Sequence, residues 1–451
     1  MKMELQVGRN RTSGSLFDRQ VYNLDFDRFW QENRTVLLIS LFCFLGALLY
    51  RSWPNFLHPS LYVEDNTHYF SYFYGNHHDF SALLHNTNGY HNIFNNLIGL
   101  LVAKFDVRWQ PTLYMLTGTT FAVLAVMALP VSGLLKNKYL LIAAPLLLGL
   151  SGLNHLFYYV TLTYQLYVLI ILLLTMLFWQ PLKGIFGNVL LFLFLSFLIW
   201  SGPYSVLVVP FSFCFILFFR GKTVMLLLLS LVTIFYTLTV TEHMILLRNL
   251  LKPEIYLIWT DVLFSKVFFM GMHGGIGPKK VLLVLGFFFI VLTLLRRDTF
   301  YLKVACLFFV LINSGLAALF LSKKFMISLR ILPCYLVISQ YFWLLFLLFT
   351  ADRLLGMRKV LTHGGLLVLA LAVFFVVVDN RTHPDKGRLP IQTGLPDFLN
   401  LVHQKEAELA DTKDRALILE YGTDRFHPVV RIGRFGDPSI QVEHIHVKAS
   451  E

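Results

Sequence analysis

The chain has 451 residues, of which 56% are hydrophobic and only 14% are charged. A soluble domain carries about 25% charged residues, so a soluble protein of this composition is excluded. Repeated apolar stretches near the ~20 residues that cross a bilayer predict an all-α polytopic membrane protein. The net charge of +12 is explained by positive charges near span ends and lipid headgroups, so we expect membrane lipids and no nucleic acid as partners.

Residues 1–34 are polar and rich in arginine, which predicts a cytoplasmic leader without a cleavable signal peptide. Within the leader, residues 24–33 predict an interfacial helix, and the first span follows over Thr35–Tyr50. A polar outer loop, residues 51–110, comes next. Its segment Asn92–Phe105 predicts a helix at the membrane surface, because its apolar residues recur at helical spacing.

Ten further apolar stretches bring the total to about eleven transmembrane helices within residues 35–378. These stretches are Pro111–Val131, Tyr139–Leu150, Tyr159–Trp179, Ile185–Trp200, Tyr204–Phe219, Val224–Val240, Val281–Leu295, Tyr301–Leu321, Ile331–Thr350 and Val360–Val378. Short basic connections place the N-terminus in the cytoplasm by the positive-inside rule. Loops 51–110 and 241–280 and the C-terminal tail, residues 379–451, are then extracytoplasmic.

The tail has the composition of a soluble segment and predicts a small α/β unit packed on the outer face. Leu395–Ala410 has helical periodicity, Ala416–Tyr421 and Val429–Ile432 read as short strands, and Ile440–Val447 alternates as a half-buried strand does. The four cysteines, Cys43, Cys214, Cys306 and Cys334, lie in apolar stretches and predict no disulfide framework.

Glu64 and Asp65 are the first candidates for catalysis, because they follow the first span in a polar loop. Adjacent carboxylates on an extended segment point in opposite directions, so one can face a cavity while the other holds a neighbouring element. A carboxylate at the membrane boundary can act as a general base on an acceptor hydroxyl, with Asp65 as the first choice. The alternative is a pair of solvated loop acids.

The positive-inside rule explains basic residues on the cytoplasmic side, but several basic residues lie on the predicted outer side. They are Lys279, Lys280, Lys323, Lys324 and Arg330. Binding of an anion, such as the phosphate of a lipid carrier, would explain their position. Arg330 could bind this phosphate with the planar set of donors on its guanidinium group. The alternative is contact with lipid headgroups by long side chains.

Aromatic and amide side chains in the loop suit sugar binding, with His68, Tyr90, His91 and Tyr204 as candidates. Tyr204 follows a Ser201-Gly202-Pro203 turn between two apolar runs. A divalent metal held by residues such as His77, His78 and Asp79 is the less favoured alternative, because the spacing of a helical zinc site is absent. We therefore expect no obligatory cofactor.

In the order Glu64-Asp65, Gly89-Tyr90-His91, Ser201-Gly202-Pro203 and Arg330, these motifs resemble the GT-C superfamily of membrane glycosyltransferases. In particular they resemble a group of bacterial envelope proteins. The resemblance implies a GT-C-like fold and a polyprenyl-phosphate-linked sugar donor. It also implies a catalytic acid in the first outer loop and a phosphate contact at Arg330. Ile331 departs from the group, in which an aromatic residue usually follows the arginine.

The sequence thus predicts an inner-membrane glycosyltransferase that transfers a sugar to a cell-envelope glycan, lipid or protein. A lipid or glycan transporter or flippase is the first alternative, although nearly uncharged spans argue against it. A non-catalytic protein of envelope assembly is the second.

Overall fold

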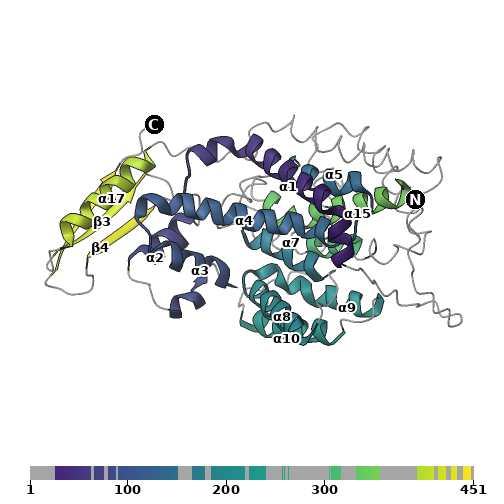
Figure 1. Ribbon diagram of the computed structural model, residues 1–451. Helices are drawn as coiled ribbons and strands as arrows, with labels where there is room; N and C mark the ends of the chain where they lie inside the picture. Colours follow the sequence, from purple (N-terminus) through teal and green to yellow (C-terminus); the bar gives the residue numbers. More distant parts are fainter. Residues whose placement is uncertain are drawn as a thin grey trace, which may run out of the picture.

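The computed structural model shows a mostly helical chain with a small sheet at its C-terminal end (Figure 1). The structure describes residues 26–61, 65–75, 80–87, 90–150, 165–177, 184–218, 223–239, 306–315, 332–355, 394–410, 415–422, 428–433 and 440–447, with isolated residues 256, 259, 263 and 304.

The first helix, α1 (Phe26–Leu57), is longer than the sequence analysis predicts. The expected interfacial helix and first span form one helix, because no glycine or proline interrupts residues 26–45. Near its end, Arg51 donates a hydrogen bond to the Leu150 carbonyl oxygen at 2.7 Å. This bond joins the end of α1 to the end of α5 (Lys138–Leu150).

Helices cover most of the other predicted spans that fall within the described residues. They are α4 (Gln110–Val131), α5, α7 (Gln165–Leu177), α8 (Ile185–Ile199), α9 (Val208–Phe218), α10 (Thr223–Thr239) and α15 (Leu332–Leu355), with a shorter helical stretch at Cys306–Gly315. The predicted spans Val281–Leu295 and Val360–Val378 and the loop 241–280 lie outside the described residues, apart from residues 256, 259 and 263.

Two of the described helices, Phe29–Leu57 and Val107–Val131, are both long and apolar enough to cross a membrane. The other apolar helical stretches whose side chains the structure describes have 10–17 residues, including Val337–Asp352 within α15. The mostly helical class with a small C-terminal α/β unit is therefore confirmed, whereas the number of spans remains a prediction.

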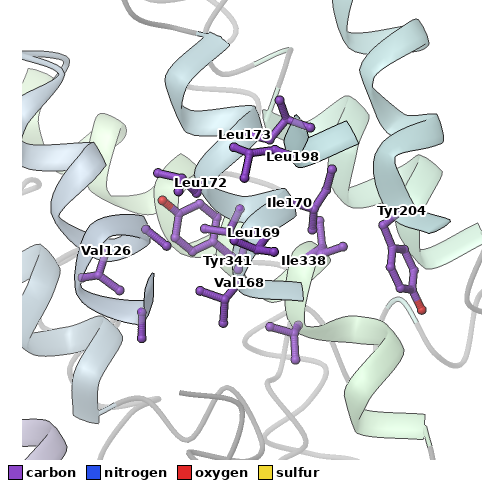
Figure 2. Close-up of a cluster of buried hydrophobic side chains, with 14 of the residues drawn as sticks. Val126, Val168, Leu169, Ile170, Leu172, Leu173, Leu198, Tyr204, Ile338 and Tyr341 are labelled. Carbon is purple, nitrogen blue, oxygen red and sulfur yellow. The ribbon is translucent and has the colours of Figure 1, made fainter. Parts of the chain in front are cut away.

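The hydrophobic core is centred on α7, whose residues Val168 to Leu174 are all buried (Figure 2). Figure 2 shows α7 side chains beside Val126 of α4, Leu198 of α8 and Ile338 and Tyr341 of α15. The Tyr341 hydroxyl lies 3.0 Å from the Thr175 hydroxyl, so a buried polar pair joins α7 to α15. Burial of apolar side chains from several helices holds this bundle together.

The bundle has two distinct ends. At one end, Asp352 of α15 accepts hydrogen bonds from the backbone N–H groups of Lys136 and Asn137, in the turn between α4 and α5. At the other end lie the segment 65–109 and the C-terminal ends of α8 and α10. We call this second end the loop end.

The loop segment folds into short elements. They are η1 (Asp65–Phe70), α2 (Ser71–Gly75), η2 (Phe80–Leu84), a hairpin of β1 (Asn86–Thr87) and β2 (Tyr90–His91), α3 (Ile93–Val102) and η3 (Val107–Trp109). The predicted helix after Asn92 is confirmed as α3, and its buried residues include polar side chains. Asn95 and Asn96 are fully buried, whereas Leu101 is exposed. Asn96 is held because its amide donates to the Leu83 and His85 carbonyl oxygens, at 3.0 Å each.

The predicted helix and strands of the tail are confirmed as α17 (Leu395–Leu409), β3 (Arg415–Tyr421), β4 (Val429–Gly433) and β5 (Gln441–Val447). The strand order is β4-β3-β5, with β4 antiparallel and β5 parallel to β3. Strand β5 is more exposed than the half-buried strand that its alternation predicts, whereas β3 and β4 pack against α17. Figure 1 shows this unit at one extremity of the molecule, next to α2 and the start of α4.

Candidate functional site at the loop end

Asp65 begins a helical segment that runs without a break from η1 into α2. The first six residues of this segment, Asp65–Phe70, are π-helical. π-Helical turns are rare and occur frequently at functional sites. Asp65 itself is 1% exposed, so the second carboxylate of the Glu64-Asp65 motif is buried.

Tyr69 lies one turn after Asp65 and connects this segment to α3. Its hydroxyl oxygen accepts hydrogen bonds from the side-chain amides of Asn95 at 3.1 Å and Asn92 at 3.4 Å. Asn92 also caps α3, because its side-chain oxygen accepts a bond from the Asn95 backbone N–H at 3.2 Å. All three side chains are buried, so this network fixes the position of η1 against the start of α3.

Tyr114 of α4 is another buried residue of this site. Its side chain is 1% exposed and interacts electrostatically with both Asp65 and Tyr69. Within the described part of the chain, its hydroxyl has no hydrogen-bond partner. Leaving a buried hydroxyl without a partner costs free energy.

The second and third sequence motifs meet beside this network. The Trp200 carbonyl oxygen accepts a hydrogen bond from the Ile93 backbone N–H at 3.1 Å, and the His91 and Trp200 rings stack with centroids 6.1 Å apart. The Tyr236 hydroxyl of α10 donates a hydrogen bond to the His91 carbonyl oxygen at 3.0 Å. The end of α8, the hairpin and the end of α10 are thereby held together around His91.

The other predicted sugar-binding residues occupy different positions. Tyr90 is half-buried in the hairpin, and His68 is half-buried in η1, where burial lowers its pKa and keeps the imidazole neutral near pH 7. Tyr204 is 5% exposed and belongs to the hydrophobic core. Figure 2 shows its hydroxyl pointing away from the Tyr341 cluster.

Several predicted site residues lie outside the described residues. They are Glu64, Lys279, Lys280, Lys323, Lys324, Arg330 and the candidate metal ligands His77, His78 and Asp79. Among the residues that are described, no group of three or more histidine, cysteine, aspartate or glutamate side chains is placed to hold a metal ion. The described cysteines Cys43 and Cys306 are free thiols.

Four residues of this site were not predicted from the sequence: Tyr69, Asn95, Tyr114 and Tyr236. A signal existed for Asn95, because Asn92, Asn95 and Asn96 recur at helical spacing in an otherwise apolar segment. Tyr69 has the i+4 spacing from Asp65 that places two side chains on one helical face. Tyr114 and Tyr236 carry no such signal, because a tyrosine in an apolar helix is ordinarily part of the core.

Comparisons with known protein families, with curated proteins and with solved structures find no match to this chain. The site is therefore interpreted from its own residues.

Proposed function

We propose that the protein is a membrane glycosyltransferase of the GT-C type, with about eleven spans and its N-terminus in the cytoplasm. It takes a sugar from a polyprenyl-phosphate donor and transfers it to a cell-envelope glycan, lipid or protein. The reaction takes place at the loop end, on the outer face of the inner membrane. The resemblance of four short motifs to this superfamily is the starting point of the proposal.

The arrangement of the motifs in space supports the proposal beyond their sequence. The described residues of three of the four motifs, far apart in sequence, lie together at the loop end. Asp65 is connected through Tyr69 to Asn92, and His91 stacks on Trp200 beside Ser201-Gly202-Pro203. A chain whose motifs were unrelated surface loops would have no reason to bury amides and tyrosines between them.

In the proposed reaction, a hydroxyl oxygen of the acceptor attacks the anomeric carbon of the donor sugar. The bond from that carbon to the phosphate oxygen breaks, and the polyprenyl phosphate leaves with the electron pair. The acceptor proton passes to a carboxylate of the Glu64-Asp65 pair, which acts as general base. The side chains of His91 and Trp200 supply polar and apolar contacts to the sugar.

The leaving phosphate needs fixed positive charge in a site from which water is largely excluded. We assign this role to Arg330, with Lys323, Lys324 and Lys280. In support, α15 begins at Leu332, two residues after Arg330, and Asp352 near its C-terminus lies at the end opposite the loop end. The intervening helix is about 30 Å long, so α15 begins toward the loop end.

The experiment is a donor-consumption assay with the purified full-length chain in lipid nanodiscs. Polyprenyl-phosphate-linked sugars are added one at a time with an envelope lipid extract as acceptor, and released polyprenyl phosphate is measured by mass spectrometry. We expect release with one donor class and its loss in the double variant Glu64→Gln/Asp65→Asn. Release that persists in the double variant would exclude the proposed base.

The non-catalytic alternative also has an observation in its favour. Asp65 is 1% exposed, as a carboxylate with a purely structural role would be. If Asp65 is the base, η1 must move to admit the acceptor, and if Asp65 positions η1, Glu64 is the base. Single variants separate these roles, because the base variant loses turnover while a positioning variant also changes thermal stability.

A further inference from the structure

The C-terminal module, formed by α17 and strands β3 to β5, packs against α2 and η3 in the described part of the chain. Strand β4 packs on α2, where the Val429 backbone N–H donates a hydrogen bond to the Ser71 hydroxyl oxygen at 2.9 Å. Helix α17 packs on η3, where the His403 imidazole lies 3.5 Å from the Asp106 carboxylate.

One contact falls on the segment that continues from Asp65, and the other on the segment that precedes α4. Ser71 is the first residue of α2, and the helical segment that contains it starts at Asp65. Asp106 caps η3, which continues directly into α4, the helix that carries Tyr114. The module therefore contacts both the helical segment that carries Asp65 and the segment that leads into α4, whose Tyr114 interacts electrostatically with Asp65.

Tyr74 makes a further contact between α2 and the module. The partly buried side chain of Tyr74, in the last turn of α2, faces the Glu406 carboxylate of α17 and the Asp106 carboxylate. Burial raises the pKa of Tyr74, and the two carboxylates raise it further, so this hydroxyl stays neutral. Asp106 itself stays ionised, because its hydrogen bonds with Arg108 lower its pKa to about 2.

From these contacts we propose that the C-terminal module is a clasp that holds the Asp65 segment against α4 and so sets the burial of Asp65. The hydrogen bond between Val429 and Ser71 joins residues that are 358 positions apart in sequence. Its donor is a backbone N–H, which every residue except proline would provide at position 429. Ser71 is thus a positioning residue. The bearing of the clasp on turnover rests on the proposed glycosyltransferase function, but the clasp itself does not.

The test is hydrogen–deuterium exchange on the full-length chain in nanodiscs, comparing Ser71→Ala with Ser71→Thr. Loss of one hydrogen bond predicts roughly 3- to 10-fold faster exchange of the amides in residues 66–75 for Ser71→Ala. Threonine keeps an acceptor oxygen and restores slow exchange. Helix propensity cannot produce this pattern, because alanine favours a helix more than serine does and threonine favours it less.

A second variant, Asp106→Asn, addresses the other contact. Asparagine can still cap η3, but it removes the negative charge that faces His403, so exchange in residues 66–75 again increases. Glu408→Gln is the matched control, because Glu408 pairs with Lys405 within α17 and is exposed. This control leaves exchange in residues 66–75 unchanged.

Two results would overturn the clasp. The first is unchanged exchange in residues 66–75 of Ser71→Ala. The second is faster exchange that extends equally through α8 and α15, which would make the module a general stabiliser of the bundle. Neither result depends on an activity assay, so failure of the clasp and failure of the proposed function are distinguishable.

Discussion

The two ends of the bundle each contain an aspartate beside a helix terminus, and their surroundings differ. At the end opposite the loop, Asp352 is half-buried and accepts bonds from two backbone N–H groups, which is an ordinary way to close a turn. At the loop end, Asp65 is fully buried on a π-helical turn beside Tyr69 and Tyr114. The first arrangement closes a turn, whereas the second is the position of the proposed general base.

The largest expected effect separates these two carboxylates by activity. Asp65→Asn removes a charge while keeping the size of the side chain, and we expect it to lower turnover by at least about 100-fold. Asp352→Asn keeps an acceptor oxygen and should retain turnover. The measurement is donor consumption by each variant at matched expression and thermal stability. Equal turnover in both variants would remove the distinction between the two ends.

A packing test compares two helical glycines. A Cβ atom at Gly99 of α3 would lie 2.5 Å from Phe73 of α2, whereas one at Gly46 of α1 would meet no atom within 4 Å. Gly99→Ala should therefore destabilise the protein by about 1–3 kcal/mol, because the loop end must shift to admit it. Gly46→Ala should be neutral or stabilising by up to about 1 kcal/mol. Thermal unfolding in nanodiscs checks both, and a neutral Gly99→Ala would show that α2 and α3 do not pack this closely.

Two buried tyrosines, one at the loop end and one in the core, allow the strength of their hydrogen bonds to be compared. Tyr69→Phe removes the acceptor of two asparagine amides, while Tyr341→Phe removes one hydroxyl that faces Thr175. We expect a loss of about 2–3 kcal/mol for Tyr69→Phe and about 1 kcal/mol for Tyr341→Phe. Chemical denaturation of both variants gives the ranking. The reverse order would place the tighter polar network in the core.

The smallest expected effect concerns pH. Burial lowers the pKa of His68 below its ordinary value of 6.5, so the unfolded chain binds this proton more readily than the folded chain. The contribution of His68 to stability is fully present above pH 6.5 and is lost as the pH falls through the lowered pKa. His68→Gln should have a smaller decrease in melting temperature between pH 7.5 and 5.5 than the parent chain, which thermal unfolding at each pH measures. Identical pH profiles would show that His68 is as accessible as a free histidine.

The sequence predicts the helices and the tail well because their signals are local. Periodicity identifies α17 and the three tail strands within one or two residues of their observed bounds, apart from the exposure of β5. The hairpin at residues 86–91 was not predicted, although Asn88-Gly89 between its strands is a strong hairpin signal.

The candidate site is predictable only in part, because its decisive contacts are not local. Asp65 and His91 are recognisable as polar residues in an otherwise apolar chain. Nothing in the sequence indicates that Tyr114 faces Asp65, or that the Val429 backbone reaches Ser71. Such contacts are set by the packing of distant elements, which residue type and spacing do not encode.

The central claim is that donor and acceptor meet at the loop end, around the buried Asp65. The most direct measurement is photoaffinity labelling of the full-length chain with a polyprenyl-phosphate sugar that carries a photoreactive group on the sugar, followed by peptide mapping. We expect labels in residues 65–75, 90–96 and 200–204, and we expect an excess of the unlabelled donor to reduce them. Specific labels confined to the opposite end, around residues 132–137 and Asp352, would contradict it.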